Sequence, residues 1–148
     1  MKIQFVCTGN TFRSRMAEAY LKSKNIPNLI VSSSGIRADR NLNGPVGKCT
    51  VQTLSNHNLL PYLSASWTMA NQQSLEAQDL VIFLDQNHYD FCCQEKNWHI
   101  PNYQIWHISD LPDELNEEGD NKKILQFSEE TFEKIKDKVD QLVKKELA

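Results

Sequence analysis

Apolar runs in this chain alternate with segments whose apolar residues recur at helical spacing. Short runs rich in β-branched and aromatic residues predict buried strands at residues 3–7, 29–31, 80–84 and 103–108. Helical spacing predicts helices at residues 14–24, 46–58, 71–78, 86–95 and from about residue 128. Because strands that alternate with helices form parallel sheets, we expect an α/β fold. It would be a three-layer αβα structure with a four-stranded, doubly wound parallel sheet and helices on both faces.

The expected C-terminal helix has the most complete pattern. Ser128 is expected to cap its first turn, and Glu129 and Glu130 follow near the positive end of the helix dipole. Its apolar stripe consists of Phe132, Ile135, Val139, Leu142 and Val143. The acidic segment before it, residues 109–126, is expected to be a loop.

Length and composition narrow the class of protein. The 148 residues have the length of one domain, and we expect residues 1–148 to form it. A hydrophobic content of 40% excludes a wholly disordered chain, and the net charge of −3 gives no overall basic surface for nucleic acid. No apolar run approaches the roughly 20 residues of a membrane span, and the N-terminal run is too short for a signal peptide. We therefore expect a cytoplasmic protein without nucleic-acid or membrane partners, either a monomer or a weak dimer.

The cysteines raise the question of disulfides or metal ligands: Cys7, Cys49, Cys92 and Cys93. Without a secretory signal, free thiols are expected. The sequence has no CxxC pair, which argues against a zinc ribbon or a thioredoxin motif. His88 lies close to Cys92 on a predicted helix, but structural zinc needs four ligands. We therefore expect no metal and no cofactor.

The segment between the first strand and the first helix has the features of a phosphate-binding loop. A tight loop there supplies converging backbone N–H groups and the positive end of a helix dipole, at the edge of the sheet where ligands bind. Gly9 and Asn10 tolerate the positive φ that such a loop requires. The residues expected to bind the phosphate are Thr8, Gly9, Asn10, Thr11, Phe12 and Ser14.

Cys7 has the surroundings of a nucleophile. A helix dipole and a nearby cation lower the pKa of a thiol and favour the thiolate. Arg13 is that cation, and its planar guanidinium can also hold two oxygens of a phosphoryl group. Ser14 can donate a hydrogen bond to the thiolate. The pattern predicts that Cys7 attacks phosphorus and that Arg13 is a second catalytic residue.

In this loop the chain resembles the low-molecular-weight protein tyrosine phosphatase family. The most specific part is CTGNTFRS followed by MAEA, and the resemblance extends over nearly the whole chain. Residues 33–35 look like the Ser-Ala-Gly of the family, and residues 75–80 resemble the segment that enters its third strand. The resemblance implies no metal and a phosphocysteine intermediate. The implied activity is hydrolysis of phosphomonoesters, on a phosphorylated protein with phosphotyrosine as the first expectation, or on a small phosphomonoester.

The family takes its general acid from an aspartate in a loop after the fourth strand. Asp110 directly follows the predicted strand here, and we expect it to be the acid; Asp113 is the second choice. Such an acid protonates the leaving group and then acts as a base on water.

Three residues depart from the family pattern. Leu111 replaces the proline that usually follows the acid, and no tyrosine follows, so the aromatic wall that grips phosphotyrosine is expected to be absent. Phe12 stands where many relatives carry a second loop cysteine, so a protective disulfide with Cys7 is unavailable there. Arg15 replaces a common proline in the first helical turn. These departures affect the expected specificity more than the chemistry.

Thr11 makes phosphoarginine the first alternative substrate. Bacterial protein arginine phosphatases of this family resemble this loop and carry a threonine at the matching place. In them the β-branched side chain narrows the pocket and can help to orient the attacking water. The acidic segment could also favour a guanidinium group.

Two further alternatives remain. Arsenate reduction occurs on the same fold and needs two more cysteines; Cys92 lies in the right region, but Asp85 stands where its partner is expected. A disulfide between the adjacent Cys92 and Cys93 would be strained. The other alternative is an inactive phospho-binding or regulatory module, against which the retention of Cys7 and Arg13 argues.

Overall fold

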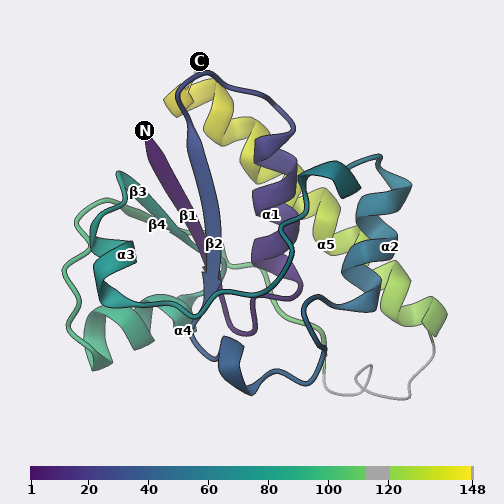
Figure 1. The fold of residues 1–148 in the computed structure, drawn as a ribbon, viewed down its shortest axis with the longest axis horizontal. Helices are drawn as coiled ribbons and strands as arrows, with labels where there is room; N and C mark the ends of the chain where they lie inside the picture. Colours follow the sequence, from purple (N-terminus) through teal and green to yellow (C-terminus); the bar gives the residue numbers. More distant parts are fainter. Residues whose placement is uncertain (113–120, 148) are drawn as a thin grey trace.

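Four parallel strands form one sheet in the order β2-β1-β3-β4 in the computed structural model. Figure 1 shows the sheet with the helices around it. The structure describes residues 1–112 and 121–147. The strands are β1 (Lys2–Cys7), β2 (Ile30–Gly35), β3 (Leu80–Phe83) and β4 (Tyr103–Ile105). β1 is central, because it pairs with β2 on one side and with β3 on the other. The predicted α/β fold class is confirmed.

Helices cover both faces of this sheet (Figure 1). On one face lie α1 (Arg13–Lys22) and α5 (Asn121–Leu142), with α2 (Lys48–Asn56) packed against them. On the other lie α3 (Gln72–Glu76) and α4 (Gln86–Tyr89). Short 3-10 helices occupy Ala38–Arg40 and Leu60–Tyr62, and π-helices follow α4 and α5 at Asp90–Glu95 and Val143–Leu147.

Alternate side chains of β1 pack into two separate cores, because successive side chains of a strand point to opposite faces of the sheet. Ile3, Phe5 and Cys7 belong to the core beneath α1 and α5. Val6 belongs to the core on the opposite face, together with buried residues of α3 and β3. Cys7 is only 2% exposed and therefore lies on the side of the sheet that α1 covers.

The C-terminal helix differs from the prediction at its start. In the described part of the chain, α5 is already helical at Asn121, so Ser128 lies inside the helix and does not cap it. Ser128 is fully buried, and its hydroxyl lies 2.6 Å from that of Thr53 in α2. Ser128 reads as a cap in the sequence because serine is common there, but here it satisfies a polar contact between two helices. The predicted acidic loop therefore ends before residue 121.

β4 and α2 are among the elements that are shorter than expected. β4 ends at Ile105, although backbone hydrogen bonds continue from Trp106 to Phe83 and from Ile108 to Leu84. The positive φ of 56° at His107 interrupts the regular ladder between them. α2 spans nine residues and buries two threonines and a leucine, whereas Val51 is half-buried.

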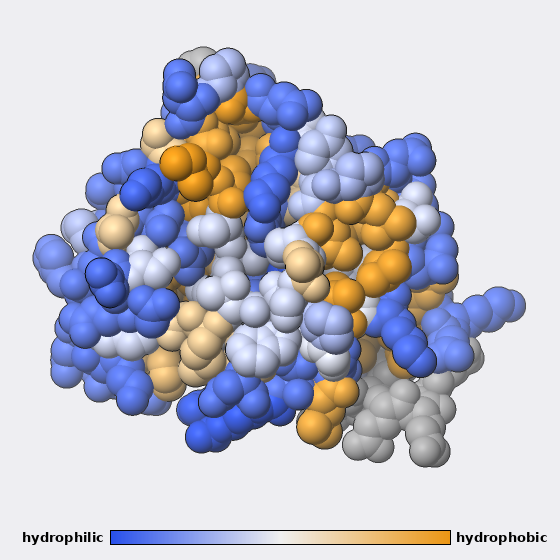
Figure 2. Space-filling model, viewed as in Figure 1, coloured by the Kyte–Doolittle hydropathy of each residue, from blue (hydrophilic) through white to orange (hydrophobic). Residues whose placement is uncertain are grey.

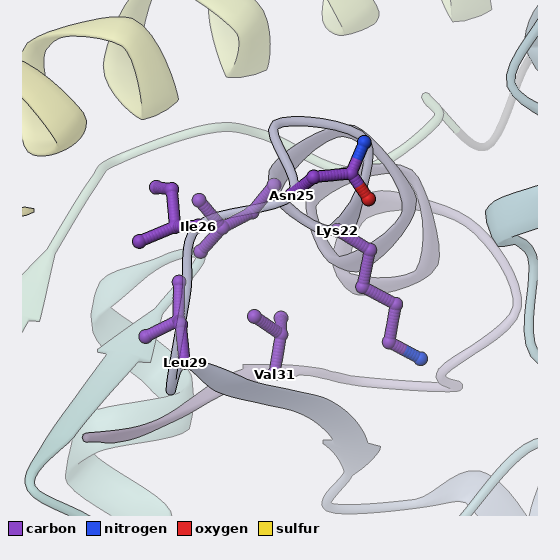
Figure 3. A pocket seen from close by; sticks show the side chains of 6 residues that line it. Lys22, Asn25, Ile26, Leu29 and Val31 are labelled. Carbon is purple, nitrogen blue, oxygen red and sulfur yellow. The ribbon is translucent and has the colours of Figure 1, made fainter.

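Two surface hollows lie away from the loop after β1. The first, of about 300 Å³, lies between the end of α1 and the start of β2, where Ile26, Leu29 and Val31 gather (Figure 3). The second, of about 500 Å³, lies between β4 and α5. Figure 2 shows apolar surface in separate areas divided by polar residues. Within the described residues, no helix has the length and apolar character needed to cross a membrane.

Candidate active site

The loop of residues 8–12 joins the carboxyl end of β1 to the N-terminus of α1. From β1 the chain continues to β2 on one side, and β3 lies on the other side. The strand order therefore reverses beside this loop. In open α/β sheets, ligands bind at this edge and at this reversal.

The backbone of the loop is arranged to bind an anion. Asn10 has a φ of 55°, the left-handed conformation that the sequence predicted for this position. In the described part of the chain, the N–H groups of Thr8 to Phe12 have no hydrogen-bond acceptor. The first turn of α1 contains no acidic residue, so the positive end of its dipole is not neutralised there. Both features favour a bound phosphate group.

Gly35 allows the loop to approach the sheet closely. It is the last residue of β2 and pairs in register with Cys7. A side chain on Gly35 would meet the carbonyl oxygen of Thr8 and the backbone nitrogen of Asn10. The glycine at this position is therefore a requirement of the loop geometry.

A chain of hydrogen bonds reaches Sγ of Cys7 through Ser14. Nδ2 of Asn10 donates to Oγ of Ser14 at 2.7 Å, and Oγ of Ser14 lies 2.8 Å from Sγ of Cys7. The serine oxygen accepts from Asn10, and its own proton can be donated to the sulfur when Cys7 is a thiolate. Both side chains are buried, so this hydrogen bond is shielded from water and favours the thiolate.

The same Asn10 is held from behind by buried residues. Its Nδ2 donates to Oγ of Ser33 at 2.9 Å, and Ser33 donates to Oε1 of Glu18 at 2.5 Å. Its Oδ1 accepts from the backbone N–H of Thr68 at 2.8 Å. Every polar atom of the Asn10 side chain is thus fixed, which fixes Ser14 in turn.

Arg13 connects the loop to the segment after β4. Its Nη1 donates to the carbonyl oxygen of Ile108 at 2.8 Å, and its Nη2 lies 3.4 Å from Oγ1 of Thr8. Oδ2 of Asp110 lies 3.5 Å from the same Nη2. Asp110 is 57% exposed while Arg13 is only 3% exposed, so the carboxylate lies above a buried guanidinium.

His88 holds the second residue of the loop. Its Nδ1 accepts from the backbone N–H of Asp85, so its Nε2 carries the proton and donates to Oγ1 of Thr8 at 3.0 Å. Burial, and then the charge of Arg13, lower the pKa of His88 to about 3. The imidazole is therefore neutral near pH 7, and the tautomer follows from its two contacts.

The rim of the loop is formed by segments after β2. Thr11 is buried; its Oγ1 accepts from Nδ2 of Asn43 at 3.4 Å, and its carbonyl oxygen accepts from Oγ1 of Thr50 at 2.7 Å. The ring of Phe12 lies 6.3 Å from that of Phe127 in α5. The position where relatives carry a second cysteine is thus filled by an aromatic contact.

The structure brings the predicted site residues together at one edge of the sheet: Cys7, Thr8, Gly9, Asn10, Thr11, Phe12, Arg13, Ser14 and Asp110. Asp113 lies outside the described residues. The sequence analysis named His88 and Arg15 but missed their contacts with Thr8 and Asn10 of the loop. For His88 a signal existed, because it follows β3 within one helical turn at the same edge. In the described part of the chain, no three side chains of His, Cys, Asp or Glu gather as a metal site.

Comparisons with known proteins agree with this geometry. A family model described as "Low molecular weight phosphotyrosine protein phosphatase" matches residues 2–148. A protein-arginine-phosphatase of Bacillus subtilis strain 168 is 37% identical over 95 residues, which are 60% of this chain and 58% of that protein. A protein-arginine-phosphatase of Geobacillus stearothermophilus is 54% identical over 37 residues, 25% of each chain. These two alignments span less than two thirds of each relative.

Solved structures match over nearly the full length. The YwlE arginine phosphatase, in a mutant with a phosphorylated active-site serine, has a TM-score of 0.73 at 26% identity, covering 99% of this chain and 98% of that chain. Wzb of Vibrio vulnificus, in complex with benzylphosphonate, has a TM-score of 0.78 at 19% identity, covering 97% of each chain. At that identity the likeness to Wzb concerns the fold alone.

Proposed function

Because the chain belongs to the low molecular weight phosphotyrosine protein phosphatase family, we propose that it is a cysteine-dependent phosphatase with Cys7 as its nucleophile. The observation that carries the proposal is the 2.8 Å contact between Sγ of Cys7 and Oγ of Ser14, beside a loop of unpaired backbone donors. A buried thiol with a hydrogen-bond donor and a nearby guanidinium is suited to react as a thiolate.

The first step forms a phosphocysteine. The thiolate of Cys7 attacks phosphorus, and an S–P bond forms while the bond from phosphorus to the leaving group breaks. The loop N–H groups and Arg13 hold the phosphoryl oxygens and stabilise their charge. Asp110, which lies 3.5 Å from Arg13, protonates the leaving group and becomes a carboxylate.

The second step releases inorganic phosphate. Water attacks the phosphorus, the carboxylate of Asp110 accepts its proton, and the S–P bond breaks. The electrons of that bond return to Cys7 as a thiolate, which the hydroxyl of Ser14 stabilises as it leaves.

Phosphoarginine is the substrate that we favour. Both matched curated relatives are described as protein-arginine-phosphatases, and Thr11 lies at the rim with its side chain fixed between the loop and Asn43. With this substrate the P–N bond breaks and the guanidine takes the proton from Asp110. The exposed carboxylate above the loop also suits a cationic leaving group.

Phosphotyrosine is the second candidate. It is favoured by the description of the family model, and it was the first expectation from the sequence. Against it stands the half-buried Leu111 directly after Asp110, where an aromatic side chain would be needed to stack on the phenyl ring.

Arsenate reduction gains little support from the structure. Burial raises the pKa of Cys92 to about 12, so its thiolate is strongly disfavoured. Asp85 caps α4 instead of providing a partner thiol. A relay of disulfides needs an accessible thiolate that could attack the oxidised Cys7.

The test compares two peptides of identical sequence that carry phosphoarginine or phosphotyrosine at the same position. We expect phosphate release from the phosphoarginine peptide with a kcat/KM about tenfold or more above that of the phosphotyrosine peptide. Cys7→Ser should abolish both activities, while Cys49→Ser, a matched change on α2, should keep them. A higher kcat/KM for phosphotyrosine would reverse our choice of substrate. Release from neither peptide between pH 5 and 8 would support a binding module instead.

A further inference from the structure

Arg15 has an environment that a surface arginine does not have. It lies in the first turn of α1 and is 0% exposed, the largest fully buried side chain in the described part of the chain. Its Nη1 donates to the carbonyl oxygens of Asn10 at 3.0 Å and of Pro45 at 2.8 Å, and its Nη2 donates to that of Ser64. One guanidinium thus joins three separate segments behind the phosphate loop.

The contact with Asn10 determines how the loop presents its donors. In a trans peptide the C=O of one residue and the N–H of the next point in opposite directions. The structure contains no cis peptide, so holding the carbonyl of Asn10 towards Arg15 turns the N–H of Thr11 away from it. That N–H is one of the unpaired donors of the loop. Its direction is determined by the hydrogen bond from Arg15 to the carbonyl oxygen of Asn10.

The charge of Arg15 is only partly balanced. Its partners are three neutral carbonyl groups, and Nε has no partner among the described residues. The nearest buried acid on α1, Glu18, already forms an ion pair with Lys22 at 2.6 Å. A buried cation is costly unless it meets a negative charge. The negative charges that act on Arg15 are Glu18, which it shares with Lys22, and the thiolate of Cys7; a phosphate bound in the loop would add a third.

We infer that Arg15 is a positioning residue for the phosphate loop and a second cation that stabilises the Cys7 thiolate. The inference rests on the proposed role of Cys7 and extends it to a residue that does not touch the substrate. It also explains how the chain accommodates an arginine in the helical turn where relatives of this family commonly have proline. The lost backbone constraint is replaced by three side-chain hydrogen bonds.

The other charges around Cys7 do not replace this role. Arg13 is engaged by Ile108 and Asp110, His88 is neutral near pH 7, and Asp110 is largely exposed. Burial lowers the pKa of Arg15, while the negative charges of Glu18 and of Cys7 oppose this shift. Because the attraction between two charges is mutual, Arg15 favours the charged form of Cys7.

The test measures alkylation of Cys7 by iodoacetamide against pH, read by mass spectrometry of the peptide that contains Cys7. Inorganic phosphate is then added to measure the concentration that halves this rate. In Arg15→Met we expect the midpoint of the pH profile to rise by about one unit. The protecting phosphate concentration should rise about tenfold, because loop donors lose their fixed directions.

Arg15→Lys separates the charge from the hydrogen bonds. Lysine keeps the positive charge but cannot bridge three carbonyl groups as a planar fork does. We therefore expect the pH midpoint to return towards the wild-type value while phosphate protection stays weak. Lys134→Met, which removes an exposed cation from α5 without touching the loop, should leave both measurements unchanged.

Two outcomes would overturn the inference. One is a folded Arg15→Met with the wild-type pH midpoint and the wild-type phosphate protection. The other, decisive if Arg15→Met does not fold, is wild-type phosphate protection in Arg15→Lys. A wild-type protein that alkylates normally and binds phosphate but hydrolyses no phosphopeptide would instead contradict the proposed function and leave the role of Arg15 standing.

Discussion

Oγ of Ser14 lies 2.8 Å from Sγ of Cys7, and the same oxygen accepts a hydrogen bond from Asn10. Glu18 accepts from Ser33, Ser33 accepts from Asn10, and Asn10 donates to Ser14. A buried carboxylate on α1 is therefore connected to the nucleophile through these contacts. The reactivity of one thiol depends on residues from β2 and α1 as well as on the loop.

Removing the Ser14 hydroxyl should weaken the nucleophile without unfolding the protein. In Ser14→Ala the thiolate loses a buried donor, so the pH profile of kcat/KM should move to higher pH and kcat/KM near pH 6 should fall about tenfold. The pH dependence of kcat/KM measures both effects. Ser32→Ala, on β2 but outside this network, is the matched control. An unshifted profile in Ser14→Ala would refute the role of the hydroxyl.

The role of Asp110 predicts a dependence on the leaving group. Asp110→Asn should lower kcat about a hundredfold or more for substrates whose leaving group needs a proton, and much less for aryl phosphates with acidic phenols. Rates for a series of aryl phosphates, plotted against the pKa of the phenol, measure this dependence. Asp113→Asn should behave as the wild type. Equal losses across the series, or a stronger effect in Asp113→Asn, would move the acid role away from Asp110.

The buried His88 predicts a loss of stability in acid. Burial and then Arg13 hold its pKa near 3 in the folded protein, whereas the unfolded chain binds the proton near pH 6.5. Protonation therefore favours unfolding as the pH falls below about 6.5, and the free energy of unfolding should decrease by up to about 1.4 kcal/mol per pH unit. Urea denaturation between pH 7 and 5 measures this slope. His88→Gln should flatten it, while His99→Gln, at an exposed position, should not. An equal slope in His88→Gln would show that other groups cause it.

The contact between Ser128 and Thr53 predicts a coupling between α5 and α2. Ser128→Ala leaves the buried hydroxyl of Thr53 without this partner and should cost about 1–2 kcal/mol, whereas Thr53→Val should cost less, because Ser128 still donates to the carbonyl oxygen of Cys49. The double variant should lose less than the sum, because no unpaired hydroxyl remains. Thermal or urea unfolding of the four proteins gives the coupling energy. Strict additivity would favour a local role of Ser128 such as the cap that the sequence suggested.

Local signals in the sequence were sufficient for the fold and for the loop. Strand runs, turn residues and helical spacing each act over a few neighbours, and together they place Cys7 at the end of β1 and Arg13 at the start of α1. The family membership and the expected hydrolase class are confirmed by the match over residues 2–148. Oδ2 of Asp110 lies 3.5 Å from Nη2 of Arg13, and the catalytic role of Asp110 stays a prediction.

Contacts between distant residues could not be predicted in the same way. His88 reaches Thr8 across 80 positions, and Arg15 reaches Ser64 across 49. Neither residue type signals such a partner, because buried histidine and arginine are satisfied by whatever oxygen the fold places nearby. The predicted cap at Ser128 was wrong for the same reason. Its partner Thr53 lies 75 positions away, so the sequence showed only the preference of serine for helix caps.

The two sides of the loop differ in the room that they leave for a side chain, as Gly35 and Gly9 show. A Cβ on Gly35 would lie 2.5 Å from the backbone oxygen of Thr8, and neither strand nor loop can yield to it. A Cβ on Gly9 would lie 3.5 Å from its nearest neighbours, Asn41 and Thr11, which is an ordinary contact. The phosphate cradle therefore has room for added bulk on the side of Asn41 and Thr11, but none on the side that faces β2.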